Sequence, residues 1–104
     1  MKRGWIENEE EMTPLLIAFD VDGTLIHQVG EAEDTPRYCV IEVFHFFEKL
    51  GHTMYIWSGG GVDYAKEWSQ RLGLKAKIVE KGSFKPDIAL DDMNVNLGIV
   101  NIRV

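Results

Sequence analysis

Residues Leu15 to Leu25 read Leu-Leu-Ile-Ala-Phe-Asp-Val-Asp-Gly-Thr-Leu, and this stretch decides the fold. Its first part, Leu15 to Phe19, is a nearly all-apolar run after a proline, which is typical of a strand buried on both faces of a parallel sheet. Asp20 and Asp22 follow directly, and a Gly-Thr pair then breaks the strand pattern, as in a tight turn. The two acids are therefore expected at the carboxyl end of a strand, the edge at which open α/β sheets bind ligands.

Strand and helix patterns alternate along the rest of the chain. A helix is predicted to begin at Thr35-Pro36, with Thr35 as its cap, and to end at Gly51. The other predicted elements are, in order, a strand at Thr53–Trp57, a helix at Val62–Leu72 that ends at Gly73, and strands at Ala76–Val79, Ile88–Leu90 and Ile99–Val104. We therefore predict an α/β, Rossmann-like, doubly wound fold, with a mostly parallel sheet of about five strands flanked by helices.

The length of the chain bounds its organisation. A chain of 104 residues is enough for one small domain and too short for two. We expect residues 1–13, which are polar and acidic, to form a tail or an added edge segment, and residues 14–104 to form a single domain. Residues 26–34 are predicted to form a short flap over the carboxylate edge, and no segment is long enough for a large cap domain.

Composition excludes several classes of function. The net charge of −6 favours solubility and disfavours broad binding to nucleic acids or anionic membranes, because such binding needs basic faces. No stretch is long enough to span a bilayer, and the first residues lack the apolar core of a signal peptide, so the cytoplasm is the expected compartment. The single cysteine, Cys39, cannot form a disulfide within one chain, and we predict it to be a buried, inert thiol.

Three predicted strands end in polar clusters, and parallel strands bring their carboxyl ends to one edge. These clusters are Asp20 with Asp22, Ser58 with three following glycines, and Asp91 with Asp92. Neighbouring carboxylates repel each other, and the usual remedies are a divalent cation, a shared proton or nearby donors. The glycine-rich turn after Ser58 leads into a helix, whose N-terminus attracts anions.

The string Asp20-Val21-Asp22-Gly23-Thr24-Leu25 resembles the first motif of the haloacid dehalogenase superfamily, as in a small phosphatase without a cap domain. The resemblance covers residues 15–96 and implies roles for the other clusters. Ser58 matches the second motif and would bind phosphate together with Gly59. Many members of the superfamily carry a charged or bulkier residue soon after that serine, where this chain has only glycine.

The third and fourth motifs each leave a choice between two residues. A lysine that neutralises phosphate and nucleophile precedes the acidic fourth motif in this superfamily, and Lys85 suits that role better by position than Lys81. Asp91 and Asp92 resemble the fourth motif, which supplies metal ligands. Because adjacent strand residues point to opposite faces, we expect one of them to bind metal directly and favour Asp91, with Asp92 acting through water or a hydrogen bond.

The resemblance implies a magnesium-dependent phosphomonoester hydrolase that acts on a phosphorylated small molecule or macromolecule. Asp20 would attack phosphorus and form an aspartyl-phosphate, and Asp22 would protonate the leaving oxygen and then activate water. The Asp20 carboxylate, the Asp22 backbone carbonyl and Asp91 would hold Mg²⁺, which prefers hard oxygen ligands. Two alternatives remain open: a non-catalytic domain of the same fold that binds Mg²⁺ or a phosphorylated partner, and a phosphotransferase. The sequence also leaves open whether the chain forms a homo-oligomer.

Overall fold

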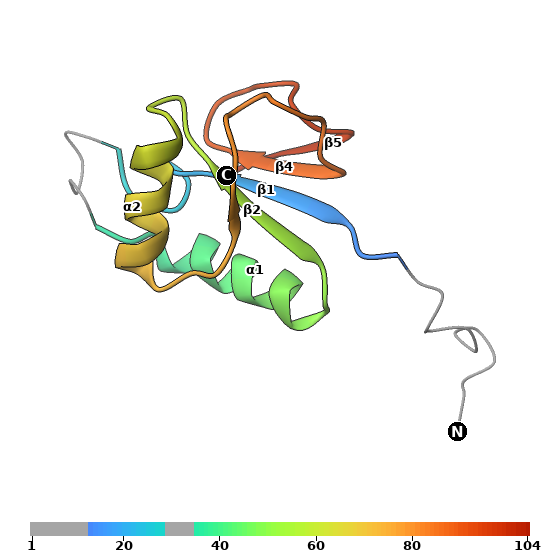
Figure 1. Cartoon of the computed structure of the whole chain (residues 1–104), viewed down its shortest axis with the longest axis horizontal. Coiled ribbons are helices and arrows are strands. Elements are labelled where there is room, and N and C mark those ends of the chain that lie inside the picture. Colours follow the sequence, from blue (N-terminus) through green and yellow to red (C-terminus); the bar gives the residue numbers. More distant parts are fainter. Residues whose placement is uncertain (1–12, 29–34) are drawn as a thin grey trace.

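The computed structural model describes residues 13–28 and 35–104, and the N-terminal segment 1–12 lies outside the described residues. The described residues form a five-stranded sheet in the order β3-β2-β1-β4-β5 together with two helices (Figure 1). In chain order the elements are β1 (Leu16–Asp20), α1 (Tyr38–Lys49), β2 (Thr53–Trp57), α2 (Val62–Leu72), β3 (Lys77–Ile78), β4 (Ile88–Asp91) and β5 (Val100–Arg103). Every pair of neighbouring strands is parallel. The predicted α/β, Rossmann-like architecture without a large cap is confirmed.

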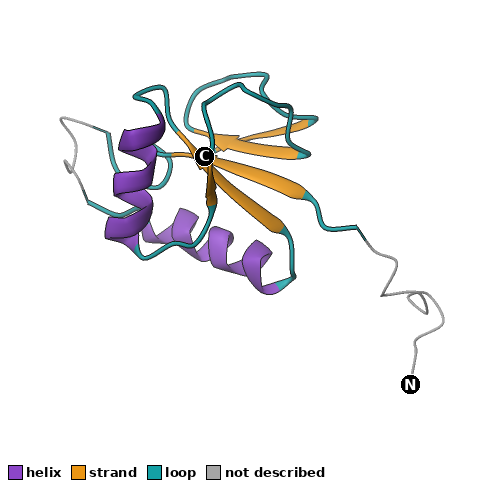
Figure 2. Cartoon of the chain, in the orientation of Figure 1, coloured by secondary structure: helices purple, strands orange, loops and turns teal. Residues whose placement is uncertain are grey.

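The direction of winding reverses between β1 and β4, as in a doubly wound sheet. The chain moves from β1 through β2 to β3 on one side, with α1 and α2 as the crossovers, and then returns to β4 on the other side of β1. Among the described residues, the links from β3 to β4 and from β4 to β5 contain no helix (Figure 2). The carboxyl ends of β1 and β4 therefore meet at the switch point of the sheet, where ligands bind in this architecture.

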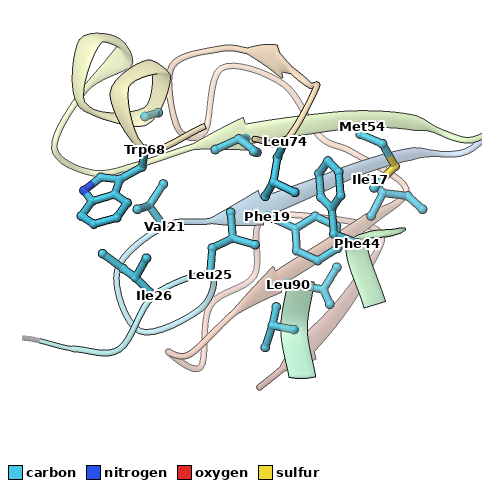
Figure 3. Packing of buried hydrophobic residues seen from close by; sticks show 13 residues of the cluster. Ile17, Phe19, Val21, Leu25, Ile26, Phe44, Met54, Trp68, Leu74 and Leu90 are labelled. Carbon is cyan, nitrogen blue, oxygen red and sulfur yellow. The ribbon is translucent and has the colours of Figure 1, made fainter. Parts of the chain in front are cut away.

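Both helices pack on the same face of the sheet. Phe19 on β1 and Ile56 on β2 are strand residues that point to this face. They belong to one core cluster with residues of both helices, namely Val40, Phe44 and Trp68 (Figure 3). The rings of Phe19 and Phe44 meet edge to face at a centroid distance of 5.2 Å. This cluster anchors β1, the strand whose end carries Asp20.

The opposite face is covered by loops. Ala18, Trp57 and Ala89 form a second buried cluster there, and Phe84 from the link between β3 and β4 packs against it. The Phe84 ring lies 5.7 Å from the Trp57 ring. Because side chains alternate along a strand, Asp20 points to the same face as Ala18, two residues earlier. The link that carries Phe84 therefore runs on the side of the sheet toward which Asp20 points.

The start of α1 differs from the predicted one. The helix begins at Tyr38 with Arg37 as its N-cap and no side-chain capping bond, so the prediction of a helix start at Thr35-Pro36 is wrong. Residues 35 and 36 instead pair with the turn after β1: the Thr35 carbonyl accepts from His27 N–H at 2.9 Å, and Pro36 forms an antiparallel bridge with Ile26. This bridge matches the base of the predicted flap, whose residues 29–34 lie outside the described part of the chain.

Cys39 is exposed, so the prediction of a buried thiol is wrong. The buried positions of α1 are Val40 and Phe44. A residue directly before a buried one is turned by about 100° around the helix axis, which carries Cys39 away from the sheet.

Candidate functional site

Asp20 and Asp91 end neighbouring strands of the sheet. Phe19 pairs with Leu90 in the parallel register of β1 and β4, so the next residue on each strand is an aspartate. Both side chains are almost completely buried, with 5% of Asp20 and 2% of Asp91 exposed. Two carboxylates held side by side in a buried place need a compensating positive charge or hydrogen-bond donors.

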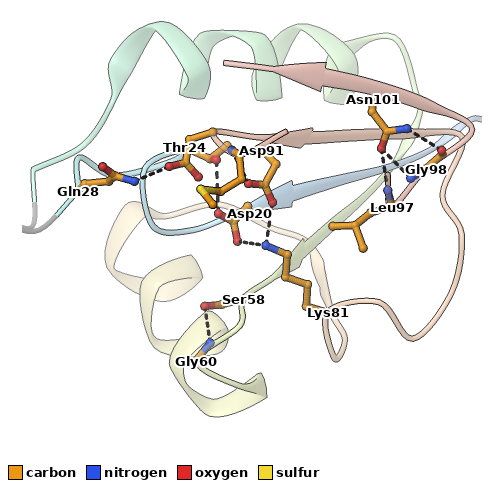
Figure 4. Close-up of polar contacts among 12 residues, drawn as sticks. Asp20, Thr24, Gln28, Ser58, Gly60, Lys81, Asp91, Leu97, Gly98 and Asn101 are labelled. Carbon is orange, nitrogen blue, oxygen red and sulfur yellow. Dashed lines mark hydrogen bonds and ion pairs between the residues drawn. The ribbon is translucent and has the colours of Figure 1, made fainter. Parts of the chain in front are cut away.

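Lys81 supplies that positive charge. Its Nζ donates to Asp20 Oδ1 at 3.0 Å and to Asp91 Oδ2 at 2.7 Å, so that one ammonium group bridges both acids (Figure 4). Lys81 reaches them because the link between β3 and β4 runs along the face toward which both aspartates point. The other oxygen of Asp91 accepts from the backbone N–H of Met93 at 2.9 Å.

Lys81, and not the favoured Lys85, is the lysine that the structure places at the carboxylates. Lys85 is exposed and does not line the hollow that contains the carboxylates, whereas Lys81 does. Three residues lie between the two lysines in sequence, and one of them, Phe84, packs onto Trp57. The position of Lys81 is thus set by the packing of this loop on the sheet, which the order of residues alone does not reveal.

Asp92 lies beyond the end of β4. Its Oδ2 accepts a hydrogen bond from Gln28 Nε2 at 2.5 Å. Ligand oxygens of Asp20, Asp91 and Asp92 all lie within 4.8 Å of one another, and we call these residues the carboxylate cluster. Because Asp92 lies past the end of β4, strand alternation does not set the direction of its side chain. The expectation that one of Asp91 and Asp92 binds metal directly and the other acts through water or a hydrogen bond stays a prediction.

A glycine makes room for Asp92. Gly23 has a φ of +77°, and a Cβ placed on it would lie 2.2 Å from Asp92 Oδ2. The backbone of this turn is fixed by three consecutive N–H groups, those of Thr24, Leu25 and Ile26, which all donate to the Val21 carbonyl. The Gly-Thr pair after the two acids thus both turns the chain and lets the third carboxylate approach.

The side chain of Asp22 is separate from the carboxylate cluster. It is exposed, and its Oδ1 accepts from the hydroxyl of Tyr64 at 2.7 Å. The Tyr64 ring lies over Gly60, where a Cβ would come within 3.1 Å of the ring. Tyr64 is on the first turn of α2, and nothing in the sequence pattern indicated this contact. The predicted role of the Asp22 backbone carbonyl as a metal ligand stays a prediction.

Ser58 directly follows β2 and is buried. Its Oγ accepts from the backbone N–H of Gly60 at 3.0 Å, which leaves the hydroxyl proton able to donate to a ligand. Gly61, with a φ of +106°, is the N-cap residue of α2. A hollow of about 280 Å³ lies over this region, lined by Asp20, Asp22, Gln28, Ser58, Gly59, Gly60, Lys81, Asp92 and Met93.

The electrostatics of the carboxylate cluster disfavour three full negative charges. Burial, reinforced by the charge of Asp91, raises the pKa of Asp20 to about 6, even though Lys81 acts in the opposite direction. Burial and the neighbouring Asp91 also raise the pKa of Asp92. Burial by itself lowers the pKa of Lys81, but its hydrogen bonds to Asp91 and Asp20 outweigh this and raise its pKa above the usual value. The lysine therefore stays charged at neutral pH.

Comparison with known proteins adds no further assignment. A scan against protein-family models and searches of curated proteins and of solved structures found no match to this chain. Within residues 13–28 and 35–104, neither helix has the length and apolar character needed to cross a bilayer.

Proposed function

We propose that this chain is a magnesium-dependent phosphomonoester hydrolase of the haloacid dehalogenase type, which acts through a phosphorylated Asp20. The observation that carries the proposal is the lysine bridge: Lys81 binds Asp20 and Asp91 at the ends of two adjacent central strands. A structural ion pair could be built anywhere in the fold, whereas this one lines a hollow at the switch point of the sheet.

The carboxylate cluster fits a magnesium ion by its chemistry. It offers hard oxygen donors on Asp20, Asp91 and Asp92 within 4.8 Å of one another. The raised pKa of Asp20 indicates that Lys81 alone does not offset the burial of this carboxylate and its repulsion by Asp91. A bound Mg²⁺ would neutralise part of this charge and polarise the oxygens of a phosphoryl group. Asp20 and Asp91 are the proposed direct ligands, and Asp92 is close enough to bind directly or through water.

Phosphoryl binding is assigned to groups on the rim of the hollow. Lys81 and the hydroxyl of Ser58 line it, together with Gly59, whose lack of a side chain lets a ligand approach the backbone. The transition state of phosphoryl transfer spreads negative charge over its oxygens, and positioned cations and hydrogen-bond donors stabilise that charge. Lys81 takes the role that the sequence pattern had favoured for Lys85.

The reaction follows in two steps. A carboxylate oxygen of Asp20 attacks phosphorus while the ester P–O bond breaks, and the leaving oxygen takes a proton from Asp22. A water molecule then gives a proton to Asp22 as its oxygen attacks phosphorus, which releases inorganic phosphate and restores Asp20. The division into two steps is the usual advantage of covalent catalysis. Tyr64 holds the Asp22 carboxylate on the rim of the same hollow that contains Asp20.

The experiment measures phosphate release from a panel of sugar, nucleotide, peptide and aryl phosphates, with and without Mg²⁺. Asp20→Asn should abolish release and keep the fold, as checked by circular dichroism. Beryllofluoride with Mg²⁺ mimics the phosphorylated aspartate and should raise the melting temperature of the wild type but not of Asp20→Asn. Binding of Mg²⁺ without phosphate release would favour the non-catalytic alternative, and transfer of phosphate to added alcohols would identify a phosphotransferase.

A further inference from the structure

One side of α1 carries exposed apolar residues at helical spacing. Cys39, Val43, Phe46 and Leu50 follow one another at intervals of four, three and four residues, which places them along a single stripe of the helix. Phe46 and Leu50 are each 60% exposed. The stripe is distinct from the buried positions Val40 and Phe44, which face the sheet. A helix of a folded domain usually keeps such a stripe for a packing partner.

The edge strand β5 carries a second set of exposed apolar residues. Val100 pairs with Ile88 and Ile102 pairs with Leu90 in the parallel register, so these residues of β5 point to the face that the helices cover. Val100 is 50% exposed and Ile102 is 38% exposed. The helices therefore leave this part of the sheet only partly covered.

The contacts of α1 with the rest of the fold show which of its flanks carries the stripe. On one flank of α1, Tyr38 and His45 share a hollow with Arg71 of α2, and α2 itself packs on β2 and β3. The stripe is on the opposite flank of α1, which faces β4 and β5 in the strand order. Arg37, which precedes α1, and Val104, which follows β5, line one hollow at the N-terminal end of the helix. We call Cys39, Val43, Phe46 and Leu50 the apolar corner.

We propose that the apolar corner is the interface of a homodimer, in which α1 of a second copy lies antiparallel to α1 across a two-fold axis. Such an axis brings the same surface of both copies together, so the surface must be complementary to itself. The stripe meets this condition, because an antiparallel copy places Val43 against Phe46 and Cys39 against Leu50 of the second chain.

The charges beside the stripe support a second copy in this orientation. Glu42 and Lys49 are both exposed and lie along the same long edge of the stripe. Glu42 is nearer the N-terminal end of the stripe, and Lys49 is nearer its C-terminal end. An antiparallel copy brings Glu42 of each chain close to Lys49 of the other. In a parallel copy the two-fold axis runs along the helices, so this flank of one chain lies on the opposite side of the interface from the same flank of the other, and the two charges do not meet. Exposed pairs of this kind contribute little affinity, but they select orientation.

The test is sedimentation velocity of the whole chain up to high micromolar concentration, in the presence and absence of Mg²⁺. The wild type should form dimers, and Phe46→Glu should raise the dimer dissociation constant by at least about tenfold, because it introduces charge at the centre of the stripe. Tyr38→Ser is the control: it also removes an exposed aromatic residue of α1, but one outside the stripe, and it should leave the dimer intact. Unfolding curves of each variant check that the monomer remains folded.

Charge reversal tests the orientation. Glu42→Lys and Lys49→Glu should each weaken the dimer, and the double variant should recover the affinity of the wild type. A wild type that stays monomeric throughout, or a dimer that survives Phe46→Glu, overturns the proposal. If the loss of dimer affinity in the double variant equals the sum of the losses in the two single variants, the antiparallel arrangement is overturned. None of these outcomes depends on phosphatase activity.

Discussion

The ammonium group of Lys81 lies 2.7 Å from a carboxylate oxygen of Asp91, ten residues further along the chain. The same group binds Asp20, so the basic side chain that lines the hollow of the candidate site is held by two acids that come from different strands. This lysine therefore couples the strand that carries the proposed nucleophile to the strand that carries the proposed metal ligand.

Replacement of Lys81 should therefore impair catalysis. We expect Lys81→Met to lower kcat/KM for an aryl phosphate by a factor of about 10² to 10³, because it removes a positive charge aimed at the phosphoryl oxygens. Lys85→Met is the matched control, since Lys85 is exposed and outside the hollow. Steady-state kinetics would check this, and a stronger loss in Lys85→Met than in Lys81→Met would contradict the assignment.

The titration of Asp20 predicts a pH dependence of stability in the absence of metal. Burial and the charge of Asp91 raise the pKa of Asp20 from 3.8 to about 6, so the folded protein binds this proton more tightly than the unfolded chain. The stabilising contribution of Asp20 is complete below the lower value and is lost as the pH rises through the higher one. The loss is of the order of 3 kcal/mol.

Asp20→Asn keeps an uncharged side chain at every pH and isolates this effect. In EDTA it should be more stable than the wild type at about pH 8, and the difference should shrink toward about pH 4, where Asp20 is protonated in the wild type. Urea unfolding at several pH values measures the difference. An Asp20→Asn protein that is less stable than the wild type at the higher pH would contradict the raised pKa.

Gly23 should be essential for the carboxylate cluster. In Gly23→Ala the new Cβ would lie 2.2 Å from Asp92 Oδ2, and the backbone φ of +77° adds strain. Gly51→Ala is the control, because Gly51 has a φ of +89° but a Cβ added there would meet no atom within 4 Å, so this variant carries the backbone strain alone. Both variants should lose about 1 kcal/mol of stability from strain. Only Gly23→Ala should also lose the rise in melting temperature caused by Mg²⁺.

Tyr64 is expected to act as a positioning residue for Asp22. Tyr64→Phe removes the hydroxyl that donates to Asp22 Oδ1. Proton donation to the leaving oxygen matters most for poor leaving groups, so kcat should fall about tenfold for alkyl phosphates and less for nitrophenyl phosphate. Tyr38→Phe, on the exposed surface of α1, should change neither rate. Equal losses for both substrate types would point to a purely structural role for Tyr64.

The sequence predicted those parts of the fold that depend on local signals. The observed bounds of β2 and α2 equal the predicted Thr53–Trp57 and Val62–Leu72, because glycines directly flank α2 and lie two residues from either end of β2. The convergence of Asp20 and Asp91 followed from the parallel sheet. The start of α1 was missed because Pro36 pairs with Ile26, a contact between segments that local propensity does not encode.

The choice between lysines depended on the path of a loop. Sequence order favoured Lys85, which is nearer to Asp91, but Phe84 packs on Tyr55 and Trp57, and Lys81 is the lysine at the acids. The contact of Tyr64 with Asp22 likewise joins residues 42 positions apart in sequence. Such contacts are set by tertiary packing, for which the spacing of residues in the sequence carries no signal.

The segment between β3 and β4 serves two purposes at once. Phe84 packs over Trp57 on the face of the sheet that carries no helix. Lys81, three residues earlier, offsets the negative charge of Asp20 and Asp91. Shortening or redesigning this connection would consequently expose a hydrophobic layer to water and remove a cation from the candidate site in the same step.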